Sequence, residues 1–122
     1  MIIVCVDNTP IMLQSLKENA YKAYPGADVQ TFLSAESALD FVNQFGCDIL
    51  LCEINPPRLE GLFLAEKVKT INPKVNIIFV TVCSESEHAK TVLRLKPSGY
   101  LTKEATNAQI VEELQNLRYP VA

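Results

Sequence analysis

The chain has 122 residues, the size of one domain, and 48% of them are hydrophobic, so it can build a buried core. Eleven Lys and Arg residues against 14 Asp and Glu give a formal net charge of −3, and the basic residues are scattered along the chain. These properties disfavour direct binding of nucleic acid or of an anionic membrane surface, since either would need a basic patch.

The first apolar run, Ile2–Val6, consists mostly of β-branched residues, which is typical of a parallel strand covered on both faces. Pro10 suits a first helical turn, with Asn8 or Thr9 as the cap, so we expect a helix from about this residue until Tyr24. The inward face of this helix is expected to carry four apolar residues: Ile11, Leu13, Leu16 and Ala20.

Two further strands enclose a second helix. Asp28–Phe32 is a short strand that we place at an edge of the sheet, and residues 49–52 form a third strand that Glu53 follows directly. Between them, Ser34 is expected to cap a helix that ends at Gly46, a residue that tolerates a left-handed conformation. This helix is expected to bury four apolar residues: Ala38, Phe41, Val42 and Phe45.

The next segment predicts a helix, a strand and another helix. An irregular loop at residues 55–61 leads into a third helix with four inward residues: Leu64, Ala65, Val68 and Ile71. Residues 76–82 are expected to form the fourth strand. Ser84 with Glu87 makes a capping box for a fourth helix that reaches about Leu95.

A turn at residues 97–99 leads into a short fifth strand at residues 100–102. Thr106 and Gln109 repeat the capping-box pattern. We expect the last helix to continue until Pro120 and to present four apolar residues at helical spacing: Ile110, Val111, Leu114 and Leu117. Five strands that alternate with five helices predict one α/β domain, in which a parallel sheet lies between two helical layers.

The cysteine pattern gives no sign of a disulfide framework or a metal site. Cys5, Cys47, Cys52 and Cys83 lack the C-x-x-C spacing of zinc and redox motifs, so we expect buried free thiols. The chain begins with a short apolar run that soon meets Asp7, and no later apolar run is long enough to span a membrane. We therefore expect a cytoplasmic protein.

Polar residues stand at the ends of otherwise apolar strands. Asp7 and Asn8 follow the first strand, Glu53 follows the third, Thr81 closes the fourth and Lys103 follows the fifth. In an open parallel sheet, functional groups gather at the carboxyl ends of the strands. Acidic and amide oxygens are suited to a hard divalent cation, and a lysine with a threonine is suited to an adjacent anion. This pattern is typical of phosphoryl chemistry.

Three segments, in this order, resemble response-regulator receiver domains: VDNTP at residues 6–10, DILLCEINPPRLEG at residues 48–61 and GYLTK at residues 99–103. The resemblance covers nearly the whole chain. It implies a flavodoxin-like, doubly wound (βα)5 domain with strand order 2-1-3-4-5. The domain would occupy residues 1–122, either as a stand-alone regulator or as the N-terminal part of a longer one.

The resemblance also implies a role for each strand-end residue. Thr81 would be the hydroxyl that meets a phosphoryl oxygen, Lys103 the cation that pairs with it, and Tyr100 an aromatic switch that turns inward on activation. Each role has a structural alternative, because Thr81 is also an ordinary strand residue and Tyr100 an ordinary packing aromatic.

The acceptor position departs from the family, because it holds Glu53 where the nucleophile is usually aspartate, and the second member of the acidic pair is Asn8. Asp7, Glu53 and the backbone of Asn55 would therefore form a weak Mg²⁺ site or none, since affinity depends on carboxylate count. The carboxylate of Glu53 lies one methylene farther out, and a displacement of about 1 Å can cost on the order of a hundredfold in rate. It could instead pair with Lys103 or hydrogen-bond Thr81 and hold an active-like state permanently.

Three functions are compatible with these residues. The first is a non-phosphorylatable receiver, not an enzyme, that controls an output domain for transcription, with contacts to that domain or to a second copy through the last two helices and the fifth strand. The second is an active phosphoacceptor that uses Mg²⁺ and a sensor histidine kinase. The third, a small phosphotransfer enzyme or hydrolase, lacks a glycine-rich phosphate loop and has Thr9 where a second acid would stand.

Overall fold

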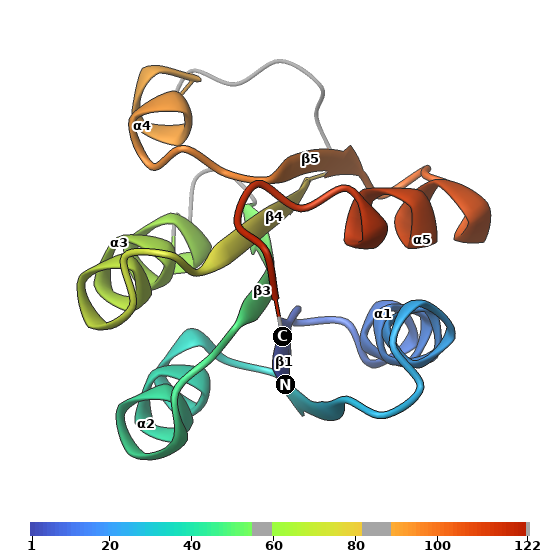
Figure 1. Cartoon of the computed structure of the whole chain (residues 1–122), viewed down its shortest axis with the longest axis horizontal. Coiled ribbons are helices and arrows are strands. Elements are labelled where there is room, and N and C mark those ends of the chain that lie inside the picture. The colour runs from blue at the N-terminus through green and yellow to red at the C-terminus, as the bar shows by residue number, and fades with distance from the viewer. Residues whose placement is uncertain (55–59, 82–88, 122) are drawn as a thin grey trace.

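A computed structural model describes residues 1–54, 60–81 and 89–121 of the chain (Figure 1). The strands are β1 (Ile2–Val6), β2 (Asp28–Phe32), β3 (Ile49–Ile54), β4 (Asn76–Thr81) and β5 (Gly99–Thr102). The helices are α1 (Pro10–Ala23), α2 (Ala35–Phe45), α3 (Glu60–Ile71), α4 (Ala89–Arg94) and α5 (Asn107–Gln115). The strands pair in parallel in the order β2-β1-β3-β4-β5, so the predicted fold and the edge position of β2 are confirmed.

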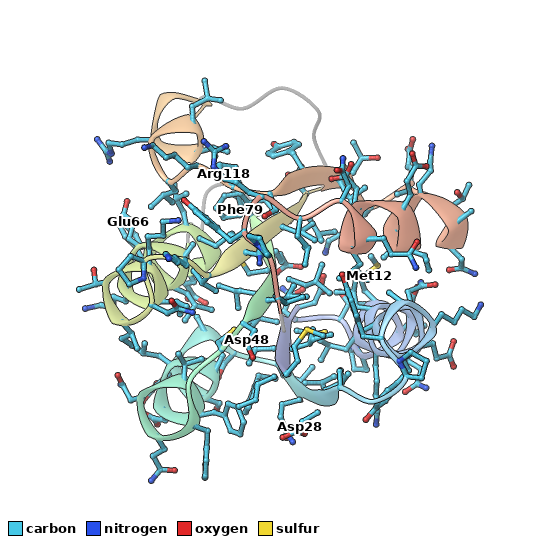
Figure 2. The ribbon with its side chains drawn as sticks, viewed as in Figure 1. Met12, Asp28, Asp48, Glu66, Phe79 and Arg118 are labelled. Carbon is cyan, nitrogen blue, oxygen red and sulfur yellow. The ribbon has the colours of Figure 1, made fainter. Side chains whose placement is uncertain are left out.

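The sheet lies between two helical layers, with α1 and α5 on one face and α2, α3 and α4 on the other (Figure 1). Successive residues of β1 point to opposite faces: Val4 and Val6 pack with α2 and α3, whereas Ile3 and Cys5 pack with α1 and α5. Both faces of the central strands are covered, and Phe79 in β4 is completely buried (Figure 2). This explains why these strands read as continuous apolar runs.

Three apolar residues expected to face the core are exposed instead: Ile11 is 84% exposed, Phe45 61% and Ile71 43%. Ile11 lies two positions before the buried Leu13, about 200° around the helix, so it points away from the sheet. Phe45 and Ile71 are the last residues of α2 and α3. A helical apolar pattern therefore overstates burial at the helix ends.

The predicted caps of α2 and α5 are confirmed. The hydroxyl of Ser34 accepts a hydrogen bond from the backbone N–H of Ser37 at 3.2 Å, and Gly46 ends α2 with φ = +83°. Thr106 and Gln109 make both hydrogen bonds of a capping box. These local signals correctly located the beginning of both helices and the end of α2.

The start of α1 at Pro10 is confirmed, but the predicted side-chain capping is not made. Thr9 occupies the cap position, but its hydroxyl caps no backbone N–H of the helix and donates to Oδ1 of Asn8 at 3.2 Å. The capping box predicted at Ser84 and Glu87 lies outside the described residues.

Several element boundaries also differ. β3 continues two residues past the predicted end, because Glu53 and Ile54 pair with Val80 and Thr81 of β4. α3 begins at Glu60, inside the predicted loop. α5 ends at Gln115 and does not continue to Pro120, because the tail folds back onto the amino edge of the sheet, where Tyr119 makes hydrogen bonds that are described below.

Cys5, Cys47 and Cys52 are free and buried, as predicted, whereas Cys83 lies outside the described residues. Burial raises the pKa of Cys5 and of Cys47 to about 12, so these thiols are neutral and packed as apolar groups. Among the helices of the described segments, none is both long and apolar enough to cross a bilayer.

Candidate functional site

The carboxyl ends of the strands bring three of the predicted residues into direct contact. Asp7 follows β1, Glu53 lies near the end of β3 and Lys103 follows β5, and their side chains form one ionic cluster. Nζ of Lys103 donates hydrogen bonds to Oε2 of Glu53 and to Oδ1 of Asp7, the latter at 3.4 Å. The pairing of Glu53 with Lys103, which the sequence left open, is therefore present in the structure.

Asp7 is the most buried member of this cluster, at 1% exposure. Its Oδ1 accepts a hydrogen bond from the backbone N–H of Thr9 at 2.8 Å, which holds the carboxylate in a local Asx-type turn. Its Oδ2 lies 3.1 Å from Nζ of Lys103 as an ion pair but accepts no hydrogen bond from the described residues. Within the described part of the chain, this buried oxygen thus keeps an unused acceptor direction.

The pKa values of Glu53 and Lys103 are both shifted in this cluster. Burial raises the pKa of Glu53, and the nearby Asp7 raises it further, while the hydrogen bond from Lys103 opposes both effects without cancelling them. For Lys103, burial alone would lower the pKa, but the hydrogen bonds to Glu53 and Asp7 outweigh it, so the pKa is raised. Lys103 therefore stays cationic, and Glu53 takes up a proton at a higher pH than an ordinary glutamate does.

Backbone contacts fix the backbone positions of Glu53 and Lys103. The N–H of Lys103 donates to the carbonyl of Thr81 at 2.7 Å, which ties the residue after β5 to the end of β4. Gly61, in the first turn of α3, lies so close to Glu53 that an added Cβ would come 1.7 Å from the Glu53 carbonyl oxygen. The spacing of strand and loop residues did not predict the importance of this glycine, which depends on how α3 packs on β3.

The structure describes three of the four remaining predicted residues: Asn8, Thr81 and Tyr100. Thr81 is 2% exposed at the end of β4, and Tyr100 is half-buried and packs toward the α2–α3 side of the sheet. Asn8 is exposed and its Oδ1 accepts from the Thr9 hydroxyl. Asn55 lies outside the described residues. The signalling roles of Thr81 and Tyr100 stay predictions. The sequence pattern did not predict that the backbone of Thr9 holds the Asp7 carboxylate.

The residues of the cluster fit a Mg²⁺ ion poorly in this arrangement. Mg²⁺ needs oxygen ligands in near-octahedral geometry, and the carboxylates of Asp7 and Glu53 are both engaged by Lys103. In the described segments, no three His, Cys, Asp or Glu side chains gather in a way that could hold a metal. Oδ2 of Asp7, which accepts no hydrogen bond within residues 1–54, 60–81 and 89–121, favours a cation, but a neutral, exposed Asn8 adds no charge to the pocket.

Solved structures of similar shape carry the same fold. A CheY-like receiver domain protein from Methanospirillum hungatei matches with a TM-score of 0.81 and 24% identity, covering 93% of this chain and 90% of that one. The BeF3-activated DrrB receiver domain matches with a TM-score of 0.77 and 21% identity, covering 93% of both chains. At these identities the likeness shows the fold alone.

Curated relatives are regulators longer than this chain. The Response regulator GacA of Pseudomonas viridiflava is 28% identical over 82 residues, which are 67% of this chain and 38% of that protein. The probable transcriptional regulator ycf29 of Porphyra purpurea is 24% identical over 119 residues, which are 96% of this chain and 56% of the relative. The family model of the response regulator receiver domain matches residues 3–115. The chain therefore belongs to the response regulator receiver domain family.

Proposed function

We propose that this receiver domain works as a regulatory binding module whose pocket is held in one state by the Glu53–Lys103 ion pair, without phosphorylation. The observation that carries the proposal is the contact of the Glu53 carboxylate with Nζ of Lys103. The resemblance makes Lys103 the cation for a transferred phosphoryl group. Because the Glu53 carboxylate already pairs with Lys103, this lysine is not available to a phosphoryl group.

The charge distribution supports the same proposal. The side chains of Glu53 and Lys103 are 13% and 19% exposed, and that of Asp7 is fully buried, so their interactions are only weakly screened by solvent. A phosphoryl donor would have to displace Lys103 from two carboxylates before its own charge could be neutralised. In-line attack would also have to begin from a carboxylate that is tied to Lys103. Both requirements disfavour phosphorylation of Glu53.

The partners that we propose follow from the family and from the lengths of its members. The chain spans 38% of GacA and 56% of ycf29, both named as regulators, so we place an output domain that regulates transcription among its partners. A histidine kinase or another signalling protein would deliver the input. We place contacts to the output domain or to a second copy on α4, β5 and α5, where Leu93 is 72% exposed.

Intact-mass spectrometry after incubation with Mg²⁺ and acetyl phosphate tests the proposal. The native protein, Glu53→Asp and Glu53→Asn are compared, the last as a variant of similar size to Glu53→Asp that cannot accept a phosphoryl group. We expect Glu53→Asp alone to gain one phosphoryl group, because aspartate shortens the side chain and loosens the pair with Lys103. A phosphoryl gain by the native protein that Glu53→Asn abolishes would overturn the proposal and make Glu53 an active acceptor.

A further inference from the structure

The residues after α5 form a strap, residues 116–121, that crosses the amino ends of β5 and β4, at the opposite edge of the sheet from the ionic cluster (Figure 1). Leu117 and Val121 are partly buried against the core on the α1–α5 side. Arg118, labelled in Figure 2, and Pro120 are exposed. The strap therefore buries little apolar surface, and polar contacts must hold most of its length.

Asn76, the first residue of β4, holds the middle of the strap. Its side chain is 1% exposed and makes a reciprocal pair of hydrogen bonds with the backbone of Tyr119. The amide nitrogen donates to the Tyr119 carbonyl at 2.8 Å, and the amide oxygen accepts from the Tyr119 N–H at 2.8 Å. Asn76 thus binds the strap as a neighbouring strand would, with one donor and one acceptor.

Ser98, the residue before β5, links both strands to the strap. Its hydroxyl donates to Oδ1 of Asn76 at 2.7 Å and accepts from the N–H of Arg118 at 3.0 Å. Its own N–H donates to the carbonyl of Ile77 in β4 at 2.8 Å. The hydrogen bonds that hold the strap therefore depend on the relative positions of the amino ends of β4 and β5.

Lys69, near the end of α3, fixes the outer side of the strap. Its Nζ lies 4.7 Å from the centre of the Tyr119 ring and donates to the Tyr119 hydroxyl at 3.4 Å. Segments held by a few polar contacts, with little apolar burial, open locally at lower cost than the core unfolds. The strap has these properties.

We infer that the strap is a latch that senses the alignment of β4 with β5 and opens when the pocket end of these strands rearranges; this inference rests on the function proposed above. The same two strands begin at Asn76 and Gly99 and end beside Thr81 and Lys103. β4 spans roughly 17 Å at about 3.3 Å per residue, and a paired strand is stiff along its axis. A small shift between the strands at the pocket would misalign Asn76 and Ser98, and hydrogen bonds weaken steeply with poor geometry.

Trypsin provides the first test, because cleavage after Arg118 needs the strap to open and releases residues 119–122. Asn76→Ala is compared with Asn72→Ala, a matched change at the end of α3, whose side chain binds Cys47 and Lys74 and makes no hydrogen bond to the strap. We expect Asn76→Ala to speed this cleavage roughly tenfold or more, since two hydrogen bonds are lost, and Asn72→Ala to leave it near the native rate. Equal rates in the two variants would overturn the latch.

Amide hydrogen exchange at Tyr119 provides the second test, of the coupling to the pocket. Lys103→Met breaks the ionic cluster, and Ala38→Gly serves as a variant that loses global stability, because Ala38 is a buried residue of α2 that belongs to neither the ionic cluster nor the strap. We expect Lys103→Met to speed exchange at Tyr119 several-fold beyond Ala38→Gly, after correction for global unfolding measured in urea. No difference between the two would overturn the coupling. The mass measurement on Glu53→Asp tests the proposed function separately, so the two failures can be distinguished.

Discussion

The carboxyl edge of the sheet, where the strands end, and the amino edge, where they begin, are held by different interactions. At the carboxyl edge, Lys103 pairs with the carboxylates of Asp7 and Glu53, and Oδ2 of Asp7 accepts no hydrogen bond from any residue that the structure describes. At the amino edge, Asn76 and Ser98 hold the strap through neutral hydrogen bonds of 2.7 to 3.0 Å. Charged side chains therefore hold the carboxyl edge, whereas neutral hydrogen bonds of Asn76 and Ser98 hold the strap at the amino edge.

This difference has an energetic consequence. Removal of one partner from a buried ionic cluster leaves a charge without compensation, whereas loss of a neutral hydrogen bond costs only the desolvation of the groups left behind. The carboxyl edge should therefore be more sensitive to single substitutions than the amino edge.

Lys103→Met should have the largest effect on stability, because it leaves the carboxylates of Asp7 and Glu53 side by side without a cation. We expect a loss of about 3 kcal/mol in the free energy of unfolding, measured by urea denaturation at neutral pH. The double variant with Glu53→Gln should recover part of this loss by removing the repulsion. A single variant as stable as the native protein would contradict the charge balance described for this edge.

Gly61→Ala should follow, because the new Cβ would meet the carbonyl oxygen of Glu53 at 1.7 Å and α3 would have to move away from β3. We expect a loss of about 2 kcal/mol, as for overpacked sites. Gly26→Ala is the matched control, since nothing lies within 4 Å of its added Cβ. Similar urea midpoints for the two alanine variants would show that the close approach at Gly61 is relieved at little cost.

Asn76→Ala should cost less, about 1–2 kcal/mol, because neutral groups of Tyr119 and Ser98 are left behind and the strap can expose them to water. The same urea denaturation measures this loss beside that of Lys103→Met. If Asn76→Ala were the more damaging of the two, the ranking of the edges would be reversed.

The smallest effect is a pH dependence of the carboxyl edge. The pKa of Glu53 is raised above its ordinary value of 4.5, so the folded protein binds this proton more tightly than the unfolded chain does. The stability gained from the proton on Glu53 is therefore fully present below pH 4.5, the ordinary pKa, and is lost as pH rises through the raised pKa. Urea midpoints of the native protein minus those of Glu53→Gln should fall across this window. A difference that rises with pH would contradict the direction of the shift.

Most of the fold could be predicted from local patterns. Apolar runs located β1, β3 and β4, and the turn at residues 97–99 located β5. The pairs Ser34–Ser37 and Thr106–Gln109 lie where side-chain capping was expected. The predictions that were wrong concern the ends of elements, where too few residues remain for the apolar pattern to show which side is buried. Ile11 and the helix expected to reach Pro120 are examples, because only the neighbouring elements decide which end residues are covered.

The residue types of the candidate site could also be predicted, because a parallel sheet with this strand order brings the ends of β1, β3 and β5 together. Sequence alone therefore determined the fold class, the family resemblance and the presence of Asp7, Glu53 and Lys103 at one edge. Only the tertiary structure decided that Lys103 pairs with both carboxylates, that Gly61 touches Glu53 and that the tail turns back onto Asn76. The contacts of Lys103 and of Asn76 join residues more than 40 positions apart in the chain. The geometry of all these contacts depends on packing between elements, which local periodicity does not encode.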